Sequence, residues 1–318
     1  MLLKKINVAL VGFGYLGKWH YEKLLKFLNL NVVVVENGPS SQKKIKEQYP
    51  NQRVVSELDE ILSQIDAALV VTPTKTHYEL VKKLLLAKKD VFCEKPLTIS
   101  FKQSKELHEL SLQQEVILQV GHSERFHSVW EKINSSSDKL LIDNCQMCSF
   151  FRHGIFKDRA FDVDVVQDLM IHDLDLITFL LNDWPVKLQA FGSKICSTFF
   201  DHVEVIMTLE SKKIVHLSAG RNFSLEKRSA YFTGIDGCLE VDLIKHQYIV
   251  SHPSSSPGPS SFVQKNDHLM IEQEHFFKSI AEKKKVIVDS YQGMRINYLI
   301  DQVNQSLMEK KEISLIKL

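Results

Sequence analysis

The first 122 residues alternate short apolar runs with segments of helical periodicity, and this alternation constrains the fold more than any other feature. The apolar runs are nearly continuous in Val, Ile, Leu and Ala, as expected for strands that helices cover on both faces. The pattern predicts a doubly wound parallel sheet of α/β class. We expect strands at residues 6–11, 31–36, 54–55, 67–72, 90–94 and 116–120, separated by helices at residues 15–28, 42–48, 58–63, 76–87 and 101–113.

The pattern changes after Gly121, where strand-like runs follow one another with short turns. Such a series predicts a predominantly antiparallel open sheet in an α+β domain. We therefore expect two domains, residues 1–122 and 123–318. The second should hold strands at residues 186–195, 203–209, 214–219, 228–233, 238–243 and 247–250, helices at residues 125–133, 165–181, 268–284 and 292–311, and a surface loop at residues 251–261.

Charge and cysteine content narrow the classes of protein. With 40 Lys+Arg against 39 Asp+Glu, the net charge of +1 gives no overall attraction to nucleic acid or an anionic membrane, and we expect neither as a partner. No apolar run approaches the ~20 residues that span a bilayer. Five scattered Cys are no disulfide framework, and the pair Cys145 and Cys148 lacks the further ligands of a zinc site. We expect reduced strand cysteines, no bound metal and a cytoplasmic location.

A glycine-rich motif, GxGxxG, follows the first strand and opens the first helix, which is the context that dinucleotide binding requires. Gly12 permits the tight turn, Gly14 lets the backbone approach a pyrophosphate, and Gly17 allows close packing of helix on strand. Glu36 ends the second strand and suits a carboxylate that binds ribose hydroxyls. Asn37 follows it instead of an Arg for a 2′-phosphate, so we predict NAD over NADP. The predicted cofactor contacts in the motif are Gly12, Phe13, Gly14, Tyr15, Leu16 and Gly17.

Two further segments lie at carboxyl ends of predicted strands, where ligands of such sheets bind. The first segment contains Thr72, Pro73, Thr74 and, at the next helix, His77. His77 is either a cofactor contact or a residue on the helix surface. The second segment contains Glu94 and Lys95, which we also predict as cofactor contacts.

These segments, taken in order, resemble a known family. GFGYLG, VVTPTKTH and CEKPL, then Gly121-His122, Arg125-Phe126 and Asp168-x3-His172-x2-Asp175, are similar to the glucose–fructose oxidoreductase/inositol dehydrogenase family, Gfo/Idh/MocA. The resemblance covers essentially the whole chain. It implies an NAD-dependent enzyme that oxidises a CH–OH group of a sugar, with a Rossmann domain and a domain that binds substrate. It also implies a homodimer or homotetramer that pairs through the open sheet.

The resemblance assigns catalysis to Lys95, Asp168 and His172, which would also contact the substrate. Oxidation of an alcohol needs a base near neutral pKa for the hydroxyl proton, and His172 suits that role. Lys95 would stabilise the alkoxide or relay the proton, and Asp168 would orient His172 or bind a hydroxyl. Helical spacing places Asp164, Asp168, His172 and Asp175 on one face, although a solvated face has the same pattern. Residues 161–167 depart from the Gly-rich stretch of many members, so the helix entry differs.

The substrate is the least constrained element. Arg125, Arg152, His153 and Arg159 are cations that could bind a phosphate or carboxylate, and we predict the three arginines as substrate contacts. GHSERFH followed by FDVDVVQDLMIHDLDLI most resembles members that oxidise carbon 3 of UDP-N-acetylglucosamine. The alternatives are an inositol or free-sugar dehydrogenase and, in another class, a non-catalytic dinucleotide-binding regulator.

Overall fold

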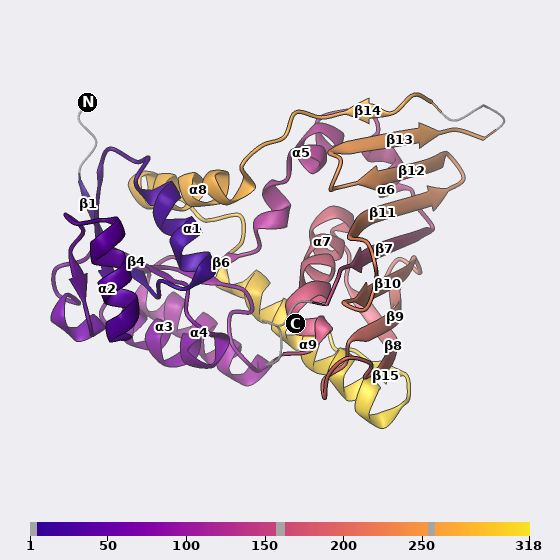
Figure 1. Ribbon diagram of the computed structural model, residues 1–318. Coiled ribbons are helices and arrows are strands. Elements are labelled where there is room, and N and C mark those ends of the chain that lie inside the picture. The colour runs from indigo at the N-terminus through magenta and orange to yellow at the C-terminus, as the bar shows by residue number, and fades with distance from the viewer. Residues whose placement is uncertain (1–4, 157–162, 254–257) are drawn as a thin grey trace. The chain divides into compact units, whose positions relative to one another are not determined.

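The computed structural model describes residues 5–156, 163–253 and 258–318 (Figure 1). The chain forms two compact units. The first comprises Met1–Ser123 and Leu269–Asn297, and the second comprises Glu124–His268 and Tyr298–Leu318. This differs from the predicted single division after residue 122, because the chain returns to the first unit for one helix and the beginning of another.

The first unit is built on a six-stranded sheet in which all described strands run parallel. Their order is β3-β2-β1-β4-β5-β6, the arrangement of a doubly wound fold. The predicted parallel sheet is therefore confirmed. Its strands are β1 (Ile6–Val11), β2 (Leu30–Val35), β3 (Val54–Val55), β4 (Ala67–Val70), β5 (Asp90–Glu94) and β6 (Leu118–Gly121).

Helices cover both faces of this sheet, with α1 and α8 on one side and α3 and α4 on the other (Figure 1). Phe276 and Phe277 of α8 enter the core beside Tyr21 and Leu24 of α1. This packing explains why a C-terminal helix belongs to the N-terminal unit. The helices are α1 (Tyr15–Leu24), α2 (Pro39–Gln48), α3 (His77–Leu86), α4 (Phe101–Gln114), α8 (His268–Glu282) and the first turns of α9 (Ser290–Glu309).

The helix predicted at residues 58–63 is wrong in type. The structure has a single 3-10 turn, Leu58–Glu60, closed by a capping box between Glu57 and Glu60. Leu58, Ile61 and Ile65 are buried, and their spacing of three and four residues imitates a helix.

The second unit contains a nine-stranded sheet with the order β14-β13-β12-β11-β7-β10-β9-β8-β15. Every neighbouring pair is antiparallel except β7 and β10, which run parallel. The predominantly antiparallel sheet is thus confirmed. Its strands are β7 (Met147–His153), β8 (Pro185–Ser193), β9 (His202–Leu209), β10 (Ile214–Gly220), β11 (Lys227–Gly234), β12 (Gly237–Asp242), β13 (Gln247–Ser251), β14 (Ser261–Phe262) and β15 (Ile313–Ser314).

The sequence analysis missed β7, the central strand of this sheet. Cys148, Phe150 and Arg152 point to the buried face, and the residues between them are more exposed. An arginine at a core position breaks the apolar alternation by which a strand is identified. Arg152 is tolerated there because buried carboxylates surround its guanidinium group.

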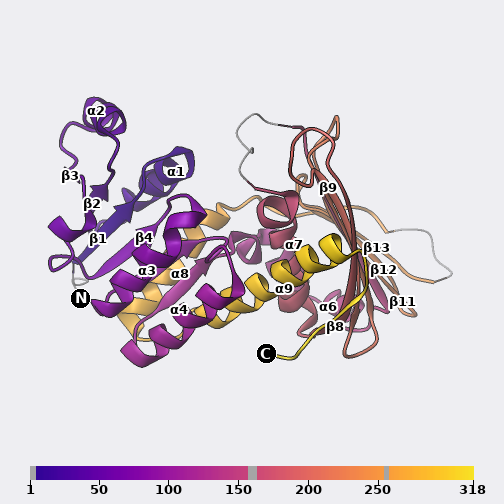
Figure 2. The same cartoon turned by 90° about the horizontal axis from the view of Figure 1, so that it is seen from below.

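Helices pack on one face of the second sheet, which Figure 2 shows nearly edge-on with α6, α7 and α9 on the same side. The predicted helix at residues 165–181 is divided into a π-helix, η4 (Val166–Met170), and α7 (Ile171–Leu181). The predicted helix at residues 125–133 is divided into a 3-10 turn, Ser123–Phe126, and α5 (Ser128–Asn134). A short helix, α6 (Lys139–Asp143), was not predicted. Among the described helices, none has the length and apolarity to cross a membrane.

Candidate active site

The turn between β1 and α1 has the backbone geometry that a dinucleotide site requires. Gly12 has φ +94°, and a Cβ there would lie 2.6 Å from the carbonyl oxygen of Val71. A Cβ on Gly17 would lie 2.4 Å from the Gly12 carbonyl oxygen. A Cβ on Gly14, in contrast, would meet nothing within 4 Å. The outer two glycines are thus required by packing, and the middle one leaves open space beside the N-terminus of α1, where a pyrophosphate fits.

Glu36 lies directly after β2 and is fixed by two backbone donors. Its Oε2 accepts a hydrogen bond from the Phe13 N–H at 3.0 Å, and its Oε1 accepts one from the Gly38 N–H at 2.9 Å. The carboxylate is therefore joined to the glycine-rich turn and remains half-buried. Each carboxylate oxygen can accept further hydrogen bonds, so the group is pre-oriented for ribose hydroxyls.

His77 does not lie on the helix surface, which was one of its two interpretations. Its side chain is buried, with Nδ1 2.9 Å from the carbonyl oxygen of Pro96 and Nε2 2.8 Å from that of Thr72. The ring therefore ties together the two loops that follow β4 and β5, and both ring nitrogens face backbone oxygens. His77 is therefore a buried residue that positions these loops and not a residue of the helix surface, and its contact with the cofactor stays a prediction.

The carboxylate of Glu94 is also buried and hydrogen-bonded within the first unit, and its contact with the cofactor stays a prediction. Its Oε1 lies 2.8 Å from Nε2 of His20, and its Oε2 accepts a hydrogen bond from the Lys95 N–H at 3.1 Å. Gln273 of α8 lies 2.8 Å from the other nitrogen of His20. Burial opposes ionisation of Glu94, but the His20 hydrogen bond and the charges of His20 and Lys95 hold its pKa below the ordinary value. This network fixes the backbone at Lys95.

Sequence reasoning missed His20 and Gln273. One available signal was the position of His20, three residues after Gly17 and so on the same buried face of α1. Gln273 gave no signal, because it reaches His20 across more than 250 residues of chain.

In the second unit, η4 and α7 carry the remaining predicted catalytic residues. Asp164, Asp168 and His172 are all half-buried, whereas Asp175 is fully buried. Asp168 lies within the π-helix and His172 is the second residue of α7. A π-helix inserts one extra residue per turn, is costly for the backbone and occurs frequently at functional sites. Of the four residues predicted to form a polar face, Asp164, Asp168 and His172 are therefore accessible, and Asp175 is not.

Arg125 and Arg152 form ion pairs inside this unit instead of an open anion site. Arg125 binds Asp175 with two hydrogen bonds, of 2.8 and 2.6 Å. Arg152 binds Asp173 at 2.8 Å and Glu124 at 3.0 Å. Burial opposes ionisation of Glu124, but the charges of Arg152 and Arg228 hold its pKa at about 2. Both predicted substrate arginines therefore have buried carboxylate partners with which a substrate anion would compete.

The other two predicted cations differ from each other. His153 stacks on Phe223 with ring centroids 3.8 Å apart, and its Nε2 lies 2.8 Å from Oγ of Ser218. Burial and the nearby charges of His202 and Lys227 lower its pKa to about 4, so it is neutral at pH 7. Arg159 lies outside the described residues.

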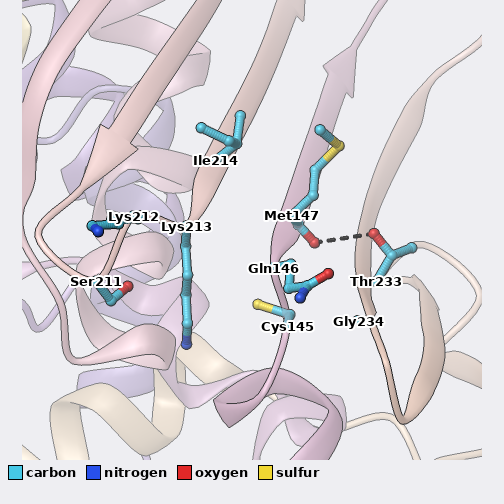
Figure 3. A pocket seen from close by; sticks show the side chains of 9 residues that line it. All are labelled: Cys145, Gln146, Met147, Ser211, Lys212, Lys213, Ile214, Thr233 and Gly234. Carbon is cyan, nitrogen blue, oxygen red and sulfur yellow. Dashed lines mark hydrogen bonds between the residues drawn. The ribbon is translucent and has the colours of Figure 1, made fainter.

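A cavity of about 690 Å³ in the second unit is separate from these residues. Figure 3 shows it at the ends of β7, β10 and β11, between Lys213 and Thr233, with Cys145 on its wall. Both Cys145 and Cys148 are buried free thiols. Both were predicted to be strand residues, and of the two only Cys148 lies in a strand, β7. None of the predicted catalytic or cofactor residues lines this cavity.

Comparison with known proteins tests the assignment that the motifs suggest. A model of the Gfo/Idh/MocA oxidoreductase family, described as an NAD-binding Rossmann fold, matches residues 6–122. A model of the Gfo/Idh/MocA C-terminal domain matches residues 144–240. The chain belongs to the Gfo/Idh/MocA family. It is therefore an oxidoreductase whose cofactor is NAD, and the glycine turn and Glu36 are the residues that fit this cofactor.

Relatives within the Gfo/Idh/MocA family cover nearly the full chain. The UDP-N-acetylglucosamine 3-dehydrogenase of Acidithiobacillus ferrooxidans is 26% identical over 299 residues, 92% of this chain and 94% of its own. Its solved structure matches with a TM-score of 0.88 at 25% identity over 96% of this chain and 98% of its own. The inositol 2-dehydrogenase of Rhizobium meliloti is 24% identical over 98% of this chain and 99% of its own.

A further solved structure matches in fold alone. The scyllo-inositol dehydrogenase of Lactobacillus casei with bound NAD(H) and scyllo-inositol has a TM-score of 0.83 at 19% identity, over 98% of this chain and 99% of its own.

Proposed function

We propose that this protein is an NAD-dependent dehydrogenase of a secondary hydroxyl on a nucleotide sugar, with carbon 3 of UDP-N-acetylglucosamine as the first candidate. The observation that carries the proposal is the full-length match to a UDP-N-acetylglucosamine 3-dehydrogenase in both sequence and fold. The half-buried pair Asp168 and His172 supports it, since these residues retain some access to solvent while neighbouring Asp173 and Asp175 are buried in ion pairs.

Proton transfer falls to side chains of this chain. When bound, NAD supplies the nicotinamide that accepts hydride from the carbinol carbon. His172 removes the hydroxyl proton as general base, and the Lys95 ammonium group donates a hydrogen bond to the developing alkoxide. Asp168 orients His172 or the substrate hydroxyl. The Glu94–His20 network holds the backbone of Lys95 in place, which keeps its side chain ready for that contact.

One observation favours a second candidate, an inositol or free-sugar dehydrogenase. Arg125 and Arg152 are engaged with Asp175, Asp173 and Glu124, so they do not supply ready cations for a diphosphate. A substrate without phosphate needs only neutral hydrogen-bonding groups. The relative from Rhizobium meliloti, named an inositol 2-dehydrogenase, is similar over 98% of this chain.

NADH formation by the purified protein separates the candidates. UDP-N-acetylglucosamine, myo-inositol and glucose are compared under the same conditions, with an aminotransferase and an amino donor present to remove a 3-keto product. We expect turnover of the nucleotide sugar. Turnover of myo-inositol alone would reject this substrate, and absence of any redox turnover would favour the non-catalytic regulator.

A further inference from the structure

A buried carboxylate organises the turn between β8 and β9. Asp201 is fully buried, and its Oδ2 accepts hydrogen bonds from the backbone N–H groups of Ile195, Cys196 and Ser197 at 2.7, 2.7 and 2.9 Å. Its Oδ1 accepts a further bond from the Ser197 hydroxyl at 2.8 Å. Three backbone donors on one oxygen fix the turn and favour the ionised carboxylate.

Arg221 connects this turn to the segment that precedes the π-helix. Its guanidinium group is buried and donates from Nε to Oδ1 of Asp201 at 2.7 Å. One terminal nitrogen donates to Oγ of Ser197 at 3.0 Å, and the other donates to the carbonyl oxygen of Val163 at 3.0 Å. The planar fork of arginine therefore holds Asp201, the turn and residue 163 at once.

From Val163 the hydrogen bonds continue directly into η4. The Val165 N–H donates to the carbonyl oxygen of Phe200, in the same β8–β9 turn, at 3.1 Å. Oδ1 of Asp164 caps the helix by accepting from the N–H groups of Val166 and Gln167, both at 3.0 Å. The N–H of Asp168 then donates to the Asp164 carbonyl oxygen at 3.1 Å. Two tertiary bonds thus flank Asp164, one at Val163 and one at Val165, at the entry of the helix that carries Asp168.

We propose that the Asp201–Arg221 pair is a positioning device that fixes the entry of η4 and thereby the orientation of Asp168 toward the substrate. A π-helix is less favourable than an α-helix, so it persists only where the surrounding structure determines it. Here Arg221 and the β8–β9 turn are the surrounding structure that holds the π-helix. The catalytic part of this inference rests on the proposed function, whereas the structural part does not.

The test variant is Arg221→Lys. Lysine keeps a positive charge beside Asp201, so the buried carboxylate stays paired, but it lacks the fork that reaches Ser197 and Val163. The matched control is Ser306→Ala, in the same unit. Oγ of Ser306 is buried, accepts from the Ala190 N–H at 2.9 Å and donates to the Lys311 carbonyl oxygen at 2.6 Å. The control removes both bonds without touching η4.

Hydrogen exchange measured by mass spectrometry gives a readout that needs no substrate. In Arg221→Lys, we expect amides of residues 163–168 to exchange at least about tenfold faster, while those in the second half of α7 are unchanged. Ser306→Ala should accelerate exchange near Ala190 and leave residues 163–168 as in the wild type. Unchanged protection at residues 163–168 in Arg221→Lys, or equal acceleration there in the control, would overturn the inference.

Steady-state kinetics test the consequence for catalysis. Arg221→Lys should lower kcat for the sugar at least about tenfold, because a small displacement of a catalytic group has a large effect, while the KM for NAD stays the same. Ser306→Ala should keep the wild-type kcat. Equal losses of kcat in both variants would mean that the Asp201–Arg221 pair only stabilises the fold. Absence of any redox activity in the wild-type protein would reject the proposed function. The difference in hydrogen exchange between Arg221→Lys and Ser306→Ala would still decide whether Arg221 holds η4.

Discussion

We expect the choice between NAD and NADP to depend on Glu36. Its two oxygens already accept hydrogen bonds from Phe13 and Gly38, which aim a negative charge at the space beside the glycine turn. A 2′-phosphate would meet that charge, so NAD should bind better than NADP. Glu36→Gln keeps the size of the side chain and should narrow the difference between the two cofactors. Glu36→Ala should weaken NAD binding roughly 10- to 100-fold, as expected for a lost charged hydrogen bond of ~1.5–3 kcal/mol.

Isothermal titration of both cofactors measures this effect. Glu79→Ala, on the exposed part of α3, removes a carboxylate of the same unit away from the turn and should bind NAD as the wild type does. Tighter binding of NADP than of NAD by the wild type would contradict the prediction.

We also expect catalysis to depend on two single residues, Lys95 and His172. Lys95→Ala and His172→Ala should each lose about 10²- to 10⁴-fold in kcat, the usual contribution of a positioned acid or base. Both variants should bind NAD normally, because the glycine turn and Glu36 are intact. Stopped-flow measurement of NADH formation, with titration of NAD as the control, tests both statements. Near-normal turnover by His172→Ala would show that another group is the base.

At the scale of the element, sequence patterns predicted most helices and strands but not how they are adjusted. The apolar runs of the first unit gave the parallel sheet because both faces of each strand are buried. Strand β7 was missed because Arg152 occupies a core position, and its partner Asp173 lies on another element. Likewise the division of residues 165–181 into η4 and α7 depends on Arg221 and Phe200, which periodicity within the segment cannot reveal.

One element, α5, should respond to pH through its N-terminal cap. Nδ1 of His127 accepts from the Val129 N–H at 3.3 Å, and Nε2 lies 3.1 Å from the Leu243 carbonyl oxygen, to which it donates. The Nδ1 bond requires the neutral ring, because a protonated Nδ1 cannot accept. Burial lowers the pKa of His127 to about 4 from an ordinary 6.5, with His246 and His268 adding to the effect. Between these values the unfolded chain binds more protons than the folded one. The contribution of His127 to the free energy of unfolding is therefore fully present above about pH 6.5. It is lost as the pH drops toward 4, by up to about 3 kcal/mol.

The variant His127→Asn isolates this contribution, because asparagine caps a helix equally well and does not titrate in this range. Chemical denaturation at about pH 7 and about pH 5 should show a smaller loss of unfolding free energy in the variant than in the wild type. The same loss in both proteins would assign the acid sensitivity to other groups.

At the scale of the molecule, the uncovered face of the second sheet predicts self-association. Figure 2 shows helices on one side of this sheet only. The other face exposes Phe191 and Ile206, yet its polar centre is already satisfied internally. Oε1 and Oε2 of Glu204 lie 2.7 Å from His202 and 2.6 Å from His216. Covering paired polar groups is less costly than covering free ones, so a second copy of the sheet can pack there.

Ile206→Lys tests this association most directly. Ile206 is 43% exposed and stands in register with His216 on one side and Gln189 on the other, so it lies within the open face and not at its edge. A lysine there would bury an unpaired charge if two copies meet, and the cost of several kcal/mol should shift a dimer or tetramer toward monomer. Light scattering at micromolar concentration should give an oligomeric mass for the wild type and a smaller mass for the variant. Leu140→Lys, a matched change at an exposed leucine on α6, should leave the mass unaltered, since α6 lies on the covered side of the sheet. A monomeric wild type would contradict the predicted self-association.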